Sequence, residues 1–389
     1  EWKPKAYAGT YGTNGFYLPF EQDYSVEGFS TVTYEGNGTS GHYIGGTGFK
    51  PDLVWMKGRS LAQSHNVYDA IRGANRIRPD VTTAEVAGTI TFETDGFTLG
   101  TQSETNNNGS TFVAWNWDMG GTTASNTDGS ITSSVRANTT YGQSIVSYSG
   151  ASNATVDGSN NGGAYWTIGH GLSQAPELII VKKRNGAGGW YVGSDSLGST
   201  PWVSGSHLVL SATAATASNA NVLWGNTAPS STVFKVGGWD VINRSGDTYI
   251  SYCFHSVTGY SKFGSYSGTG SSGNAITTGF APAFVMIKST TVSTAGWVLY
   301  DNTRNSFNPV TSRLMADSSN AESESTVLEF NSTGFNILAT GTGMNGSGED
   351  YIYAAFADTR EYAYWLDQSG NNNDWTSNGG LTESDVMVD

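Results

Sequence analysis

The chain has 389 residues, a formal net charge of −14 and a charged fraction of only 13%. This length suits about two or three domains, and the negative charge disfavours a surface that binds nucleic-acid phosphates. No run of about 18 apolar residues is present, so we expect no membrane insertion. The 51 glycines and the aromatic content of 12% are typical of short strands joined by many turns.

The N-terminal segment 1–28 contains an Asn-Gly turn followed by alternating apolar and aromatic residues, which predicts a strand over residues 11–20. This strand has no counterpart later in the chain. Because residue 1 is Glu and the pattern is interrupted at Asp389, we expect a mature product or a piece of a larger protein.

A Gly and Pro turn followed by four apolar residues and a lysine occurs at residues 48–57 and predicts a strand buried on both faces. The same pattern, which we call the Pro box, returns around Pro176 and Pro282. The spacings of 125 and 106 residues exceed the ~20–50 residues of solenoid repeats. They therefore indicate three copies of one small domain.

Further landmarks recur in the same order around each Pro box. They are a Tyr-x-Gly strand, an aromatic strand, a Gly hairpin, and an Asn/Ser/Gly turn into an aromatic closing strand such as Thr111–Trp117. The predicted division is an N-terminal strand segment (1–28), repeat 1 (29–120), a linker (121–143), repeat 2 (144–258), repeat 3 (259–358) and a C-terminal segment (359–389).

These patterns predict an all-β protein of three tandem antiparallel β-sandwiches of the jelly-roll or lectin kind, with additional β segments at both ends. The closing strands carry large residues on both faces, as expected for strands in the middle of a sheet between two packed layers. Cys253, the only cysteine, is predicted to be a small buried residue on such a strand. A lone cysteine also excludes an intrachain disulfide.

Two Asp-x-x-Arg pairs, Asp69 with Arg72 and Asp301 with Arg304, are each followed by an Ala-Glu dipeptide. They could form a binding cluster. The alternative is a salt bridge that ties a long loop to the sheet, since one arginine can satisfy two carboxylates. Repeat 2 has Asp195-x-x-Gly198 instead and lacks the arginine, which argues against one ligand site in every repeat.

The C-terminal segment contains Asp367, Asn371 and Asp374, whose oxygens could bind Ca²⁺. The competing interpretation is a turn in which these side chains bond their own backbone. No catalytic residues are predicted: the five histidines lack metal-ligand spacing, and no nucleophile elbow, phosphate loop or dinucleotide fingerprint occurs. No other cofactor is expected.

The Pro boxes, the runs 260–268 and 351–356, and the start Tyr-Gly-Thr-Asn-Gly-Phe-Tyr-Leu resemble virion-associated tail or tail-fibre proteins of marine bacteriophages and cyanophages. The run from Asp367 to Asp374 also resembles the Asp-x-Ser-Gly-Asn turn of concanavalin-like, laminin-G-type modules. The resemblance covers nearly the whole chain. It implies a place on the surface of a virion and a structural or adhesive role beside other virion proteins.

Two functions follow from different classes. The first is a non-enzymatic part of a tail fibre, spike or head projection that touches host surface glycans. The alternative is a surface hydrolase that degrades polysaccharide. A pocket with two close carboxylates and several tryptophans would favour the hydrolase, and sandwiches packed against one another would favour the structural part. Twelve tryptophans and 20 tyrosines exceed what three small cores readily enclose, so we also expect a homo-oligomer, most simply a trimer.

Overall fold

The computed structural model describes residues 28–151, 165–219 and 223–357, and there the protein is all-β. Its helices within these ranges are α1 (Ser103–Asn106) and α2 (Pro201–Ser204), and neither is long and apolar enough to cross a membrane. The predicted strand 11–20, the segment 362–376 that we expect to lie beside it, and the three candidate Ca²⁺ ligands are outside the described residues.

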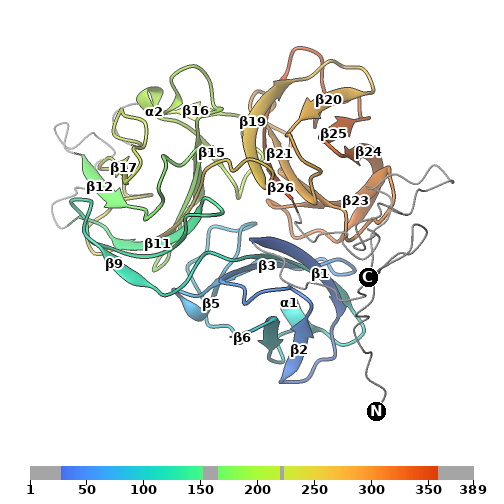
Figure 1. Cartoon of the computed structure of the whole chain (residues 1–389), viewed down its shortest axis with the longest axis horizontal. Coiled ribbons are helices and arrows are strands. Elements are labelled where there is room, and N and C mark those ends of the chain that lie inside the picture. Colours follow the sequence, from blue (N-terminus) through green and yellow to red (C-terminus); the bar gives the residue numbers. More distant parts are fainter. Residues whose placement is uncertain (1–27, 152–164, 220–222, 358–389) are drawn as a thin grey trace, which may run out of the picture.

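Repeat 1 consists of a five-stranded antiparallel sheet and a three-stranded sheet (Figure 1). The larger sheet has the order β1-β8-β3-β4-β5 and the smaller sheet the order β2-β7-β6. The predicted Gly hairpin of repeat 1 is confirmed as β6 and β7, but its two turn residues are Thr94 and Asp95 and not the expected Asp-Gly pair. The strands are β1 (Phe29–Glu35), β2 (His42–Gly45), β3 (Leu53–Gly58), β4 (Asn66–Asp69), β5 (Gly73–Ile77), β6 (Ile90–Glu93), β7 (Gly96–Leu99) and β8 (Thr111–Trp117).

Repeat 2 keeps this order as β11-β18-β13-β14-β15, and the two-stranded sheet β12-β17 faces it. The segment 121–143, predicted as a linker, instead supplies β9 and β10, which extend the sheet beyond β11. The strands are β9 (Ala124–Asn126), β10 (Ser133–Asn138), β11 (Gln143–Ser149), β12 (Trp166–Gly169), β13 (Leu178–Lys183), β14 (Trp190–Ser194), β15 (Ser206–Val209), β16 (Ala217–Ser218), β17 (Val233–Val236) and β18 (Thr248–Phe254).

Repeat 3 has the same core order, β19-β26-β21-β22-β23, but its two sheets are joined. The long strand β24 pairs with both β23 and β25, so eight strands form one continuous sheet. The strands are β19 (Ser261–Ser267), β20 (Asn274–Thr277), β21 (Phe284–Ser289), β22 (Val298–Asp301), β23 (Val310–Met315), β24 (Ser323–Asn331), β25 (Gly334–Ile337) and β26 (Asp350–Phe356).

The three Pro boxes occupy equivalent positions, as the repeat pattern predicts. Each box strand lies beside the closing strand of its own repeat, in the same register. The first apolar residue of each box pairs with the last residue of that closing strand: Leu53 with Trp117, Leu178 with Phe254, and Phe284 with Phe356.

Each Pro-box strand divides its four apolar side chains between two cores, because successive side chains point to opposite faces of a strand. In repeat 1, Leu53 and Trp55 face a core shared by all three repeats, whereas Val54 and Met56 face the sandwich of their own repeat. The same alternation holds in repeats 2 and 3. The predicted burial of these strands on both faces is therefore confirmed, and one of the two covers comes from other repeats.

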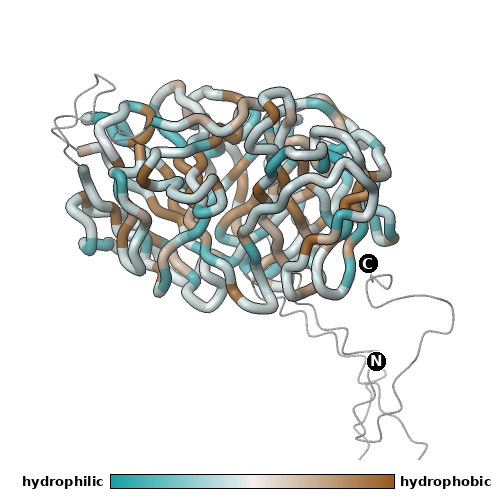
Figure 2. The backbone as a smooth tube through the Cα atoms, turned by 90° about the horizontal axis from the view of Figure 1, so that it is seen from above, coloured by the Kyte–Doolittle hydropathy of each residue, from teal (hydrophilic) through white to brown (hydrophobic). Residues whose placement is uncertain are grey.

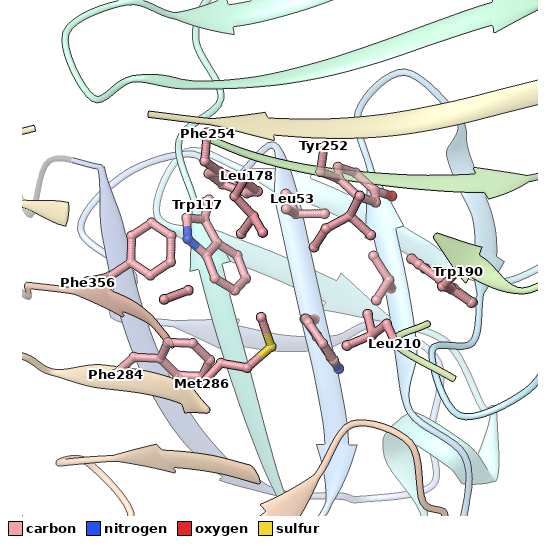
Figure 3. A pocket seen from close by; sticks show the side chains of 14 residues that line it. Leu53, Trp117, Leu178, Trp190, Leu210, Tyr252, Phe254, Phe284, Met286 and Phe356 are labelled. Atoms are coloured by element: carbon pink, nitrogen blue, oxygen red, sulfur yellow. The ribbon is translucent and has the colours of Figure 1, made fainter. Parts of the chain in front are cut away.

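The shared core lies where the three lobes meet in Figure 1, and apolar segments run through the interior in Figure 2. It encloses an apolar cavity of about 40 Å³ lined by side chains from every repeat (Figure 3). Phe356 lies in this cluster, with its ring 5.4 Å from Phe29, 5.7 Å from Trp117 and 5.8 Å from Phe254 between centroids. Each repeat therefore contributes one face of its main sheet to a core that the other two repeats complete.

Phe356→Ala tests this dependence. Truncating a buried phenylalanine costs about 3–5 kcal/mol of unfolding free energy. We expect such a loss in urea denaturation, and we expect the three repeats to unfold together in one transition. Phe307→Ala removes the same side chain from a site that is 64% exposed, and it should change stability by less than about 0.5 kcal/mol. Separate transitions for the three repeats in the wild-type chain would contradict the shared core.

Candidate functional site

The predicted Asp-x-x-Arg pairs lie at two contacts between repeats, so the four residues do not form one cluster. Arg72 Nε is 2.6 Å from Asp69 Oδ2, and Arg304 Nε is 2.6 Å from Asp301 Oδ2. All four side chains are fully buried. The aspartates end β4 and β22, and their Oδ1 atoms also accept the backbone N–H of the arginine three residues later. This local turn holds each arginine against the sheet.

Each aspartate also accepts a hydrogen bond from a closing strand of another repeat. Tyr252 in repeat 2 donates to Asp69 Oδ2 at 2.8 Å, and Trp115 Nε1 in repeat 1 donates to Asp301 Oδ2 at 2.9 Å. The Arg304 guanidinium additionally lies 5.5 Å from the centre of the Trp115 ring, a cation–π distance. The donors hold both aspartates in place from across the contact.

The glutamates of the Ala-Glu dipeptides complete both clusters, as the salt-bridge interpretation requires. Arg304 is 2.8 Å from Glu322, which also binds Arg59 of repeat 1 at 2.8 Å. Burial alone would raise the pKa of Glu322, but the hydrogen bonds and charges of the two arginines lower it below its usual value. We call these residues the Asp301 cluster: Arg59, Trp115, Asp301, Arg304 and Glu322.

The equivalent group between repeats 2 and 1 is the Asp69 cluster: Asp69, Arg72, Glu85, Arg184 and Tyr252. Arg184 of repeat 2 is 3.0 Å from Glu85, and Arg72 is 3.8 Å from the same carboxylate. The two clusters use the same positions and the same direction of contact. The side chains of each cluster use most of their hydrogen-bonding capacity on one another. This suits a structural contact between repeats and leaves few groups free to bind a ligand.

The third contact, from repeat 3 to repeat 2, lacks such a cluster. Strand pairing places Ser194 at the position of Asp69 and Asp301, and Ala354 at the position of Trp115. The sequence comparison that singled out Asp195 and Gly198 was therefore wrong by one residue. It had no strand register to align the repeats, whereas the ladder fixes the register. Asp195 instead accepts a hydrogen bond from Trp202 inside its own repeat.

A backbone hydrogen bond recurs at all three contacts, including the one without a cluster. Its donor follows the last strand of the shared five-strand order in one repeat (β5, β15 or β23), and its acceptor follows the Pro-box strand of the next. The N–H groups of Glu85, Thr216 and Glu322 donate to the carbonyls of Arg184, Thr290 and Arg59, each at 2.8 Å. Three equivalent head-to-tail contacts close a three-membered ring of repeats within one chain.

A hydrogen bond from the N–H of a tryptophan or histidine side chain also recurs at all three contacts. Trp190 Nε1 donates to Arg78 O at 2.9 Å, and Trp297 Nε1 donates to Val209 O at 3.0 Å. At the contact from repeat 1 to repeat 3, His65 replaces the tryptophan, and its Nε2 lies 2.9 Å from Met315 O. Trp55 Nε1, which can only donate, bonds His65 Nδ1, so the proton of the neutral ring sits on Nε2. Burial lowers the pKa of His65 to about 3, which keeps the ring neutral.

The lysines that end the Pro boxes are buried at equivalent places. Lys57, Lys182 and Lys288 each donate from Nζ to the carbonyl of the following residue, at 2.8, 2.6 and 2.7 Å. In repeats 2 and 3 the ammonium also approaches a carbonyl of the neighbouring repeat, that of Thr82 or Thr213. Burial lowers the pKa of all three lysines to about 8.

Residues 24–360 match the family described as "Domain of unknown function (DUF7483)". The chain belongs to the DUF7483 family. The match spans all three repeats. No curated protein and no solved structure showed a match to the chain.

Elsewhere in the DUF7483 ring, within residues 28–151, 165–219 and 223–357, no three His, Cys, Asp or Glu side chains are arranged to hold a metal ion. Cys253 is fully buried in the core of repeat 2, and burial raises the pKa of its thiol to about 12. The thiol is therefore protonated at neutral pH and inert, as predicted for a small core residue.

One further feature is a hollow of about 60 Å³ in repeat 3, between the Pro282 turn and the loop 302–309. Phe307 stands on this loop and is 64% exposed. Sequence reasoning missed it, although a signal was present. In repeat 1 only residues 70–72 separate the equivalent strands β4 and β5, so the run Asn-Ser-Phe-Asn-Pro (305–309) is an insertion.

The Asp301 cluster can be tested with repeat 2 as the template. Arg304→Leu alone leaves Asp301 buried without its cation, which typically costs about 3–5 kcal/mol. The double variant Asp301→Ser/Arg304→Leu copies Ser194 and Leu197 of the contact that lacks a cluster. We expect it to regain at least half of that loss in urea denaturation. Equal instability of the single and double variants would contradict the role of uncompensated charge.

The buried lysines predict a pH dependence on the alkaline side. Below about pH 8 the folded and unfolded states both hold the proton of Lys288, so the stability contribution of this lysine is constant. Between about pH 8 and pH 10 the folded state loses the proton while the unfolded state keeps it, so stability rises with pH.

The measurement is the unfolding free energy of the wild type minus that of Lys288→Met, at steps from pH 7 to pH 10. We expect this difference to shift in favour of the wild type above pH 8, and Lys182→Met should behave alike because its site is equivalent. A difference that stays flat with pH for both variants would show that these ammonium groups are not held in a desolvated site.

Proposed function

We propose that this chain is a structural and adhesive component of a bacteriophage virion, carried on the particle surface in a tail fibre, spike or head projection. It acts there without catalysis, beside other virion proteins, and contacts host surface glycans. The virion assignment rests on the sequence resemblance, and the architecture adds independent support for a structural role.

The supporting observation is where the tryptophans lie. Five of the nine tryptophans in the described residues belong to the shared core, where they join the repeats: Trp55, Trp115, Trp117, Trp190 and Trp297. Three more lie in the core of repeat 2, and Trp239 packs against it. Sandwiches that use their aromatic residues to bind one another suit a rigid building block. A hydrolase would instead place such residues with carboxylates in an open cleft.

One of the arguments for the expected homo-trimer no longer holds. Surplus aromatic side chains were the motive, and within the described residues these rings pack between repeats of a single chain. One chain already encloses a threefold arrangement of sandwiches. The oligomeric state stays a prediction, which the mass of the purified chain in solution decides: three times the mass of one chain supports a trimer.

The function is tested on purified phage particles whose genome encodes the chain. We expect its peptides among the virion proteins by mass spectrometry, and gold-labelled antibody against the full chain should decorate one defined part of the particle in electron micrographs. Purified chain should release no reducing sugar from host surface polysaccharide. Absence from the particles would overturn the virion role, and hydrolysis of the polysaccharide would overturn the non-enzymatic role.

A further inference from the structure

The loop 302–309 of repeat 3 is built to hold one aromatic side chain outside the protein. Asn305 Oδ1 accepts the backbone N–H groups of Thr311 and Ser312 at 3.0 and 2.6 Å. Asn308 pairs in both directions with the backbone of Phe330, at 2.7 and 3.0 Å. The two amides on either side of the exposed residue therefore fix the loop to β23 and β24. Phe307 is presented in a preorganised position, which reduces the entropy cost of binding.

The exposure of Phe307 alone would carry little weight, because single exposed apolar residues are common. The other large apolar residues that are more than half exposed in the described part of the chain are Tyr43 and Val203. Tyr43 is tied to Asp95 O by its hydroxyl at 2.6 Å. Phe307 differs because it stands beside a hollow.

The hollow combines an apolar wall with polar groups that have no partner. Pro282 and Phe330 contribute to the wall, and Asn302 and Ser306 also line it. The side-chain Nδ2 of Asn302 and the hydroxyl of Ser306 make no hydrogen bond within the described residues and are not buried, so both can bond a hydroxyl that enters the hollow. Unused capacity of this kind next to an exposed ring is typical of a binding site.

The chemistry of the lining selects a class of ligand. None of the residues around the hollow carries a charge, and the whole chain has a net charge of −14, which disfavours anionic ligands. A phenyl face attracts the slightly positive C–H groups of a flat apolar surface. Amide and hydroxyl groups exchange hydrogen bonds with hydroxyls. A pyranose ring offers both: one C–H face and a rim of hydroxyls.

We propose that the Phe307 hollow is a binding site for a neutral sugar residue of a surface polysaccharide. The sugar ring stacks on Phe307, and a hydroxyl or hydroxymethyl arm enters the hollow to bond Asn302 and Ser306. The volume of about 60 Å³ is far below the ~300 Å³ of a complete ligand pocket. The site therefore takes part of one sugar residue, with an expected dissociation constant on the order of 1 mM, and gains strength when many copies act together.

This inference rests on the proposed adhesive function and names its contact point. The test is ligand-observed saturation-transfer NMR with the full chain and single sugars at millimolar concentration. The neutral probes are the methyl glycosides of glucose, galactose and N-acetylglucosamine, with glucuronate and glucosamine as charged probes. We expect transfer to the C–H protons of at least one neutral sugar and weak transfer to both charged ones.

The variants separate stacking from general exposure. Phe307→Ala should reduce the transfer at least about fivefold, whereas Phe307→Tyr keeps an aromatic face and should retain it. Asn302→Ala should reduce transfer by removing the polar contact. Val203→Ala is the matched control, since it removes a side chain of 52% exposure in another repeat and should change nothing. Unchanged melting temperatures exclude unfolding as the cause of any loss.

The absence of saturation transfer to all neutral sugars overturns the inference. Transfer that Phe307→Ala leaves unchanged, or that is stronger for a charged sugar, also overturns it. These outcomes are separable from failure of the proposed function. If antibody decorates virions while the sugar signal is absent or independent of Phe307, the structural role stands and this site falls. If Phe307-dependent sugar binding occurs in a chain that is missing from particles, the site stands and the virion role falls.

Discussion

The architecture depends on one constraint: the main sheet of every repeat has two apolar faces. One face is covered by the smaller sheet of the same repeat, or in repeat 3 by the strands that continue its sheet. Within the described residues, the other face is covered by the two neighbouring repeats. A domain of about 100 residues buries a modest fraction of its surface, and here sharing a core raises that fraction. Ring closure is therefore a condition of stability for each sandwich.

The polar contacts show how the ring selects its order. The backbone and ring N–H bonds occur at all three contacts, so they fix a common geometry without distinguishing the repeats. The Asp69 and Asp301 clusters occur at only two contacts, from repeat 2 to 1 and from repeat 1 to 3. Buried ion pairs contribute little net stability but penalise a wrong partner strongly, because a mismatch leaves a charge unpaired. These clusters thus specify which repeat docks on which.

The contact without a cluster joins repeats 2 and 3, which are connected directly by a short stretch of chain, from Phe254 to Ser261. A short connection brings its two ends together at low entropic cost. Repeats 1 and 3 have no direct connection, since all of repeat 2 lies between them. Their contact carries the complete Asp301 cluster. A buried charge cluster therefore specifies the contact between the two repeats that no linker joins directly, while insertions such as 305–309 differentiate the outer surface.

The sequence by itself determined the all-β class, the three copies, the Pro-box strands and the closing strands. These follow from alternation, turn residues and repetition, which are local properties. It also paired Asp69 with Arg72 and Asp301 with Arg304, because their spacing places them in one turn. The Ala-Glu dipeptide that follows both pairs likewise indicated Glu85 and Glu322 as partners of the two arginines.

Only the tertiary structure decided what covers the second face of each sheet. A run such as Leu53–Met56 has the same apolar pattern whether the surface that covers it belongs to the same repeat, another repeat or another chain. The register that equates Ser194 with Asp301, the role of residues 121–143 as strands β9 and β10, and the meeting of Phe307 with Asn302 beside Pro282 were equally out of reach. All depend on strand pairing and on contacts between residues distant in the chain, and local pattern carries no information about which distant surfaces meet.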